Sequence, residues 1–420
     1  MALSPTAAPT DDQGVNAPDL QFFVFALFFI FGGITSLNDI IIPKLKELFT
    51  LSYGQALLVQ SAYFMAYLVF SLPAAMVVAR FGYLRTASFG LLAMMAGCLL
   101  FVPASGSGLF PVFLGALFVL AAGVTMVQVV ANPLISLLGP PRTAHSRLTF
   151  AQAFNSIGTT IFPIVGSALI LGSLSKVDPS TLSGAALSAY RTAETQTVVR
   201  TYLGLAAALL VIAAVVWTRR NRLPAGAGAD ANARLFGGFD LLRRPRFGFG
   251  AACIFLYVGA EVAIGSLIVN YLEQSSVLGL SQRAAGDHVA YYWGGAMVGR
   301  IIGAGLLRLV SPGKVLAGVA LGAITLLFVS THSFGVLSGW SLLAIGLMNS
   351  IMFPTIFSLA SEGLGKRAAE GSGVIATAIV GGAIVPYLTG QLADTSGSLQ
   401  FALVLPALCY LVIEIGRAHV

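Results

Sequence analysis

Amide side chains lie inside two consecutive apolar stretches of the sequence, where they could bind a polar ligand. Gln128 and Asn132 are four residues apart, so they share one face of a helix. In the next stretch Gln152, Asn155 and Ser156 begin a polar stripe along a second helix. An unpaired amide in hydrocarbon costs several kcal/mol, so this stripe must face a water-filled cavity or other helices. We expect a ligand site here, with hydrogen bonds between helices as the alternative.

A carboxyl group inside the first apolar stretch is a candidate for proton coupling. Asp39 follows Asn38 in the sequence GGITSLNDIIIPK. A charge at the bilayer centre costs at least a few kcal/mol and usually has a function. A carboxyl desolvated in this way can exchange a proton with a cavity. The alternative is that Asp39 lies near the outer interface and pairs with Lys44 or Lys46.

A second intramembrane carboxyl occupies the equivalent place in the second half of the chain. Glu261 follows Tyr257 by one helical turn, in the seventh apolar stretch. Two interpretations stay open for it: a second ligand or proton group, or the ion-pair partner of Arg300 in the next stretch. Arg300 has an alternative of its own, in which its long side chain extends to the membrane interface.

Aromatic side chains near these groups fit a sugar better than an ion. Gln60, Tyr63 and Tyr67 share one face of the second apolar stretch, and Tyr291–Trp293 cluster in the eighth. Amides suit sugar hydroxyls and aromatic rings suit the apolar face of a pyranose, so the two together suit a hexose. An aromatic belt at the membrane interface is the alternative for Tyr291–Trp293. Asn38, Tyr257 and, in the tenth stretch, Asn349 complete the candidate binding residues.

Composition places these groups in a polytopic membrane protein. The chain has 420 residues, of which 57% are hydrophobic and 9% are charged, against about one quarter charged in soluble proteins. The three cysteines lie in apolar runs and the four histidines are scattered, so neither a disulfide framework nor a metal site is indicated. The net charge of +7 comes mainly from short loops and does not indicate nucleic-acid binding. No hydrolytic or metalloprotease constellation is present, so we do not expect an enzyme.

The apolar stretches predict an all-α polytopic membrane protein with twelve transmembrane helices in two six-helix halves. Each stretch is about long enough to cross a bilayer at 1.5 Å per residue. We expect residues 1–18 to be a disordered cytoplasmic tail, 19–217 the N-terminal half, 218–246 a cytoplasmic linker and 247–420 the C-terminal half. The twelve stretches lie near 20–42, 53–79, 84–104, 108–138, 147–172, 199–217, 247–272, 288–309, 314–331, 335–360, 371–392 and 399–416.

The loops predict the orientation of these helices. With both termini in the cytoplasm, the cytoplasmic loops carry sixteen Lys and Arg residues and the opposite loops carry six, which is the asymmetry of the positive-inside rule. The halves also resemble each other. Asn132 and Pro133 precede a basic turn and a helix that contains Pro163, and Phe353 and Pro354 precede a basic turn and a helix that contains Pro386. Such a repeat is typical of transporters with a site between their halves.

The sequence resembles the major facilitator superfamily, and within it the fucose–galactose–glucose:proton symporter family. The resemblance covers almost all spans and rests on SLNDIIIPKLKELF, QSAYFMAYLVFSLPA, ANPLISLLGP, RLTFAQAFNSIG, LSAYR, YVGAE, FPTIFSLA and GGAIVP, in that order. It implies that Asp39 couples protons and contacts substrate. It also implies that Asn155 contacts sugar, with Gln152 beside it.

Two departures from that family pattern are informative. Fucose permeases carry Glu before the ANP segment, where this chain has Gln128. This difference weakens L-fucose as the substrate, favours the glucose/galactose branch, and leaves coupling mainly to Asp39. The superfamily loop after the second span is normally built around an Asp, and Ala79 takes that place here. Arg80 and Arg85 remain as candidate gating residues.

The functional expectation is proton-coupled symport of a hexose, glucose or galactose, into the cell by alternating access. We expect a monomer in a bacterial inner membrane, with sugar and lipid as its partners, no nucleic acid, and no cofactor beyond the coupling ion H⁺. The alternatives are a carrier of L-fucose or N-acetylglucosamine, sodium-coupled transport, and a membrane sensor of sugar that does not transport it.

Overall fold

The computed structural model describes residues 17–49, 53–107, 109–166, 183–223 and 235–416, and within these ranges the chain is helical without strands. Most of the predicted N-terminal tail therefore lies outside the described residues. The helices of the N-terminal half are α1 (Pro18–Phe49), α2 (Tyr53–Phe81), α3 (Tyr83–Ser107), α4 (Phe110–Leu137), α5 (Ala144–Gly166) and α6 (Gly184–Thr218).

The second half contains broken helices as well as continuous ones. Its elements are η4 (Gly237–Arg243), α7 (Pro245–Glu273), α8 (Gln282–Leu309), α9 (Pro312–His332), α10 (Gly335–Asn349), α11 (Met352–Ser361), η5 (Gly365–Arg367), α12 (Ala368–Ala378), α13 (Gly381–Ser396), α14 (Leu399–Ala402) and α15 (Val404–Gly416). The pairs α10–α11, α12–α13 and α14–α15 each form one interrupted column.

The described helices confirm the predicted all-α membrane fold. Nine of the described helical segments are long and apolar enough to cross a membrane. The other three columns are α5 and α8, which carry polar side chains, and α14–α15, which is shorter, and they complete the predicted twelve. Large apolar side chains are exposed on the outer helices, as lipid contact requires.

Glycines allow the helices to pack closely within each half. A Cβ atom on Gly158 of α5 would lie 2.1 Å from the carbonyl oxygen of Phe29 on α1. In the C-terminal half, a Cβ on Gly346 of α10 would lie 2.0 Å from the carbonyl oxygen of Tyr292 on α8. Backbones approach this closely only where the side chain is a hydrogen atom, which is the usual way membrane helices pack.

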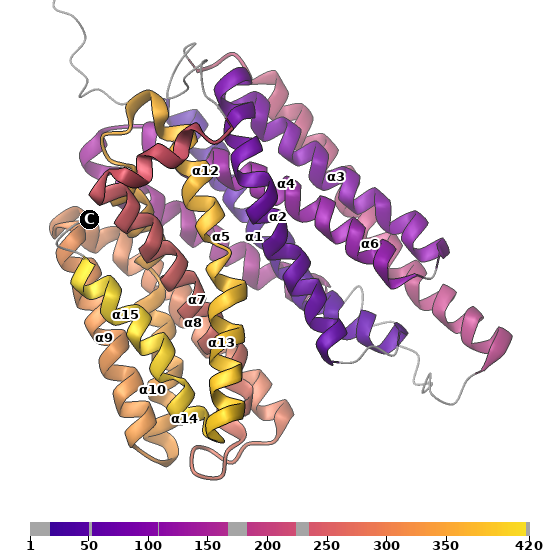
Figure 1. Ribbon diagram of the computed structural model, residues 1–420. Coiled ribbons are helices and arrows are strands. Elements are labelled where there is room, and N and C mark those ends of the chain that lie inside the picture. Colours follow the sequence, from indigo (N-terminus) through magenta and orange to yellow (C-terminus); the bar gives the residue numbers. More distant parts are fainter. Residues whose placement is uncertain (1–16, 50–52, 108, 167–182, 224–234, 417–420) are drawn as a thin grey trace, which may run out of the picture.

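The two halves meet at one end of the bundle. This end carries the connection between α6 and α7, and we call it the linker end. Figure 1 shows the halves side by side at the linker end and diverging away from it. The hydrogen bonds that join the halves in the described residues lie between the linker end and the level of Ser156 and Arg300.

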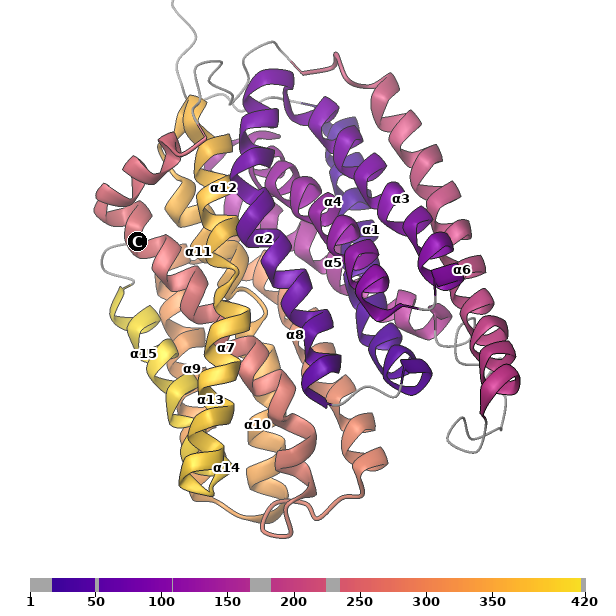
Figure 2. The same cartoon turned by 45° about the vertical axis from the view of Figure 1, so that its right-hand side comes forward.

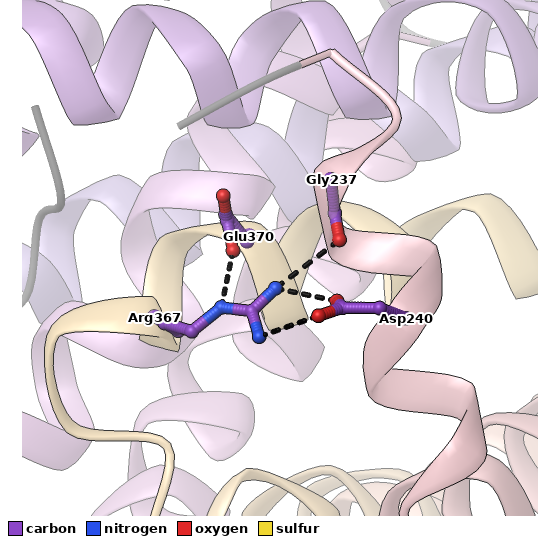
Figure 3. Close-up of polar contacts among 4 residues, drawn as sticks. All are labelled: Gly237, Asp240, Arg367 and Glu370. Atoms are coloured by element: carbon purple, nitrogen blue, oxygen red, sulfur yellow. Dashed lines mark hydrogen bonds and ion pairs between the residues drawn. The ribbon is translucent and has the colours of Figure 1, made fainter. Parts of the chain in front are cut away.

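Part of the linker is fixed to the C-terminal half by Arg367. Its guanidinium donates to both carboxylate oxygens of Asp240 at 2.5 and 3.0 Å, to the carbonyl of Gly237 at 3.1 Å, and to Glu370 at 2.6 Å (Figure 3). Leu241 of the same linker helix is buried. The hydrogen bonds from Arg367 lower the pKa of Asp240, and Asp240 in turn raises the pKa of Arg367. The linker helix η4 is therefore docked against the start of α12.

Replacing Arg367 by Ala should release η4 from α12. We expect faster amide hydrogen exchange across residues 235–244, measured by mass spectrometry at neutral pH, because the bidentate pair that orients the helix is lost. Asp240→Asn should have a similar effect. The matched control is Lys366→Ala, which removes an exposed neighbouring charge that has no partner among the described residues.

The pH dependence of this exchange tests the same pair. A carboxyl with a depressed folded-state pKa stabilises docking above its unfolded pKa, and the stabilisation disappears as pH falls through the depressed value. Wild-type exchange, corrected for its intrinsic pH dependence, should therefore approach that of Asp240→Asn in acid. Equal exchange in wild type and Arg367→Ala at neutral pH would contradict the docking role.

Candidate functional site

The four predicted amides lie on the neighbouring helices α4 and α5. Two of them have side-chain groups without a hydrogen-bond partner among the described residues. Asn132 is 2% exposed, and its Oδ1 has no hydrogen-bond partner in the part of the chain that the structure describes. Gln152 is 5% exposed, and its side-chain amide makes no hydrogen bond within the described residues. Gln128 accepts a hydrogen bond from the hydroxyl of Tyr67 at 2.6 Å. Buried polar groups are normally satisfied, so the unpartnered amides here remain available for a ligand or water.

Helix α1 closes the other side of this group. Asn155 Nδ2 lies 3.4 Å from the carbonyl oxygen of Phe28, and a Cβ on Gly32 would overlap the Asn155 amide. Thr35 Oγ1 and the hydroxyl of Tyr63 share a hydrogen bond of 2.6 Å between α1 and α2. The side chains of residues 38–49 and 53–61 lie outside the described set. This includes the predicted residues Asn38, Asp39 and Gln60, whose roles stay predictions.

Pro133 leaves a carbonyl group that the other half of the protein satisfies. A proline has no N–H, so the carbonyl four residues earlier, Val129, loses its helical donor. The hydroxyl of Ser372 on α12 donates to this carbonyl at 2.9 Å. Ser372 is fully buried. This hydrogen bond joins α4 of the first half to α12 of the second, next to Asn132.

Pro354 has the same effect at the equivalent place in the second half. It leaves the carbonyl of Ser350 without its helical donor, and Arg300 Nε of α8 donates to that carbonyl at 3.2 Å. The same guanidinium donates to the carbonyl of Gln152 at 3.3 Å and to the hydroxyl of Ser156 on α5. Arg300 therefore lies between the halves.

Asn349 is at the centre of a buried tyrosine cluster. Its Nδ2 donates to the hydroxyl of Tyr292 at 2.8 Å, and its Oδ1 accepts from the hydroxyl of Tyr410 at 2.7 Å. Its carbonyl, freed by the break between α10 and α11, accepts from Tyr257 at 2.9 Å. Asn349 is 0% exposed. The Asn349 side chain is thus engaged within the C-terminal half, and a direct contact with substrate would require its bonds to open, whereas the oxygen of the Tyr257 hydroxyl can still accept a hydrogen bond.

Glu261 lies beside this cluster. Its carbonyl accepts from Tyr292 at 3.3 Å, and its Oε1 is buried without a hydrogen-bond partner. Tyr257 lies one turn earlier on α7, and Arg300 lies on the neighbouring helix α8. Both sequence interpretations, a proton group and a partner of Arg300, are compatible with this position. Of the predicted aromatic cluster, only Tyr292 points into the protein, while Tyr291 and Trp293 are exposed.

Residues that the sequence did not single out join the halves at the linker end. His145 Nε2 on α5 contacts Glu362 Oε1 at 2.9 Å, and Arg246 pairs with the same carboxylate. The hydroxyl of Ser146 donates to the carbonyl of Ala304 at 2.7 Å and accepts from Arg308 at 3.1 Å. Burial would raise the pKa of Glu362, but the hydrogen bond with His145 and the charge of Arg246 outweigh burial and lower it.

The predicted gating residues of the α2–α3 turn, Arg80 and Arg85, make none of the described hydrogen bonds between the halves. Arg85 donates to Asn221 Oδ1 at 3.1 Å, and this contact stays within the first half and its linker. Arg80 is exposed without a partner among the described residues. Their gating role stays a prediction. No sequence motif marks His145 or Ser372, because their partners lie more than 200 residues away.

A sequence profile of the Major Facilitator Superfamily matches residues 23–386. The chain belongs to the major facilitator superfamily. It is 48% identical to a glucose/galactose transporter of Brucella abortus, and the alignment covers 98% of each chain. It is 32% identical to the L-fucose-proton symporter of Escherichia coli, over 93% of this chain and 90% of that protein. These relatives confirm the resemblance to the symporter family that contains both.

Solved structures agree with this assignment. A structure of the transporter FucP in the outward conformation aligns with a TM-score of 0.87 at 31% identity, over 95% of this chain and 98% of that chain. The superfamily fold, with twelve helices in two halves, is therefore that of a transporter and not of an enzyme. The names of these relatives support sugar transport as the general function.

Replacing Ser372 by Ala should destabilise the contact between the halves. The carbonyl of Val129 would then be buried without a donor, at a cost of about 1–3 kcal/mol, and we expect a lower thermal unfolding temperature in detergent. Ser88→Ala is the matched control. Its buried hydroxyl donates only to the carbonyl of Leu84 in its own helix, so its removal should have little effect.

A second substitution tests the cause. Pro133→Ala restores a backbone N–H that can donate to the carbonyl of Val129, so it should recover much of the stability lost in Ser372→Ala. Additive destabilisation in the double variant would show that the proline and the serine act independently.

Proposed function

We propose that the chain imports a hexose, glucose or galactose, together with a proton across a bacterial inner membrane by alternating access. The observation that carries the proposal is the group of unpartnered amides, Asn132 and Gln152, on the face of the first half that meets the second. Amides bind sugar hydroxyls as both donors and acceptors. The names of the relatives support a sugar as the ligand.

The orientation follows from charge. The linker end carries the basic turns and the α6–α7 connection, and we assign it and both termini to the cytoplasm by the positive-inside rule. The hydrogen bonds between the halves lie on this side, so the conformation is closed to the cytoplasm and faces outward. Import then requires the contacts of His145, Arg300 and Ser372 across the halves to break as the protein opens inward.

The chemistry of binding divides between the halves. Gln128, Asn132, Gln152 and Asn155 hold hydroxyls from the first half, with Gln60 as a further amide and Tyr63 against the apolar face of the ring. Glu261 and Tyr257 contribute from the second half, and Asn349 supports them through the tyrosine cluster. Asp39 carries the coupled proton, with Glu261 as a second proton group. Gln128 in place of a carboxylate favours glucose or galactose over L-fucose.

Asp39→Asn should abolish uphill accumulation of labelled glucose or galactose while sparing exchange across the membrane. The reason is that the amide cannot release a proton, but the sugar contacts on α4 and α5 remain. Uptake into cells is measured with and without a protonophore and sodium. Asp394→Asn, an exposed carboxyl on α13, is the control and should accumulate sugar normally. Accumulation that persists in Asp39→Asn would contradict the role of Asp39, and dependence on sodium would reassign the coupling ion.

Gln152→Ala should weaken sugar binding roughly tenfold, the equivalent of one good hydrogen bond. The measurement is the dissociation constant of the purified protein for glucose and galactose by titration calorimetry. Gln400→Ala is the matched control, because the Gln400 amide bonds Gln274 in the second half, away from α5. Unchanged affinity in Gln152→Ala would return this amide to helix packing.

A further inference from the structure

An aromatic ridge crosses the linker ends of three helices in the first half. Phe81 on α2 contacts Phe89 on α3 with ring centroids 5.6 Å apart, and Phe89 contacts Trp217 on α6 at 6.0 Å. Phe81 is 48% exposed and Trp217 is 40% exposed. Aromatic rings exposed at the ends of membrane helices suit the level of the lipid headgroups, where one face meets hydrocarbon and the other meets water.

Two arginines are positioned at this ridge without a carboxylate. The guanidinium of Arg220 lies 4.9 Å from the centroid of the Trp217 ring and donates to the carbonyl of Trp217 at 2.9 Å. Arg85 donates to the side chain of Asn221, the residue that follows Arg220. Within the described part of the chain neither arginine forms an ion pair.

The neighbouring arginines differ in this respect. Arg219 and Arg222 both pair with Asp19 at the start of α1, at 3.3 and 2.8 Å. Asp19 thus neutralises Arg219 and Arg222. Arg85 and Arg220, at the aromatic ridge, keep their positive charge. An anion that approached the ridge would find two guanidinium groups already held in place, which reduces the entropy lost on binding.

The position of the ridge at the outer edge of the first half indicates which kind of anion would bind there. Helices α3 and α6 lie side by side at the outer edge of the first half (Figure 2). Apolar side chains such as Leu92 and Val215 are exposed just below the ridge. A ligand here therefore touches hydrocarbon and positive charge at once. Soluble anions gain nothing from the apolar surface, whereas a phospholipid matches both parts.

We propose that this ridge binds one acidic phospholipid, with its phosphate between Arg85 and Arg220 and an acyl chain that passes the aromatic rings toward Leu92 and Val215. The lipid would join the ends of α3 and α6 beside the ion pairs of Asp19. The site is separate from the amides of α4 and α5, so it does not depend on the identity of the transported substrate. A negatively charged headgroup near two surface arginines gains binding roughly fivefold for each arginine.

Native mass spectrometry of the full chain in detergent tests the proposal. The probes are phosphatidylglycerol and phosphatidylcholine with identical acyl chains. We expect wild type to retain one phosphatidylglycerol preferentially, and Arg85→Ala combined with Arg220→Ala to bind it about twenty- to thirtyfold more weakly. Arg142→Ala combined with Arg243→Ala is the matched control, because it removes two exposed arginines from the same end of the protein. This control should bind as wild type does.

Three results would overturn the proposal. Equal retention of phosphatidylglycerol in the Arg85/Arg220 variant and wild type would remove the arginines from the site. An equal loss in the control variant would show only general attraction to positive charge. Displacement of the lipid by millimolar glycerol phosphate would point to a soluble phosphate ligand. Size-exclusion profiles and thermal unfolding verify that each variant is folded. As a further test, Phe81→Ala should weaken lipid binding although both arginines are present.

Discussion

Every backbone carbonyl inside a bilayer needs a hydrogen-bond donor, and among the prolines that take such donors away, two lie close to the contact between the halves. Pro133 and Pro354 lie at equivalent places in the two halves, and each frees the carbonyl four residues before it. The protein supplies a side chain for each. Ser372 serves Val129 from across the interface, and Arg300 serves Ser350 and also reaches α5. The contact between the halves is thus built partly from backbone groups that a regular helix would have used internally.

The buried amides differ in whether their hydrogen-bonding groups have partners within the protein. Asn349, Asn132 and Gln152 are all buried amides with similar chemistry. The carbonyl, Nδ2 and Oδ1 of Asn349 are bonded to three tyrosines, whereas Asn132 Oδ1 and the amide of Gln152 have no partner among the described residues. An unsatisfied buried amide is costly, so a native protein retains one where a ligand or water completes it. Free capacity, more than residue type, separates the face that could bind substrate from the scaffold behind it.

Rigidity within the halves and reversible contacts between them suit the proposed alternating access. Glycines bring backbones to near contact inside each half, as at Gly158 and Gly346, so each half can move as a unit. Between the halves, Gly373 of α12 packs closely against Ala75 of α2, and hydrogen bonds such as that between His145 and Glu362 lie near the linker end. Water can replace such bonds on opening, so they cost less to break than a packed apolar interface.

The sequence by itself determined the membrane class, the helical columns, the division into halves and the amide face of α4 and α5. Those properties follow from local composition and helical periodicity, which are readable within about twenty residues. It also marked Pro133 and Pro354 as repeated features. Only the tertiary structure decided that Ser372 and Arg300 satisfy the carbonyls these prolines free, that Asn349 is enclosed by tyrosines, and that His145 meets Glu362. Each of these contacts joins residues far apart in the chain, and the geometry that pairs them comes from helix packing, which no local pattern encodes.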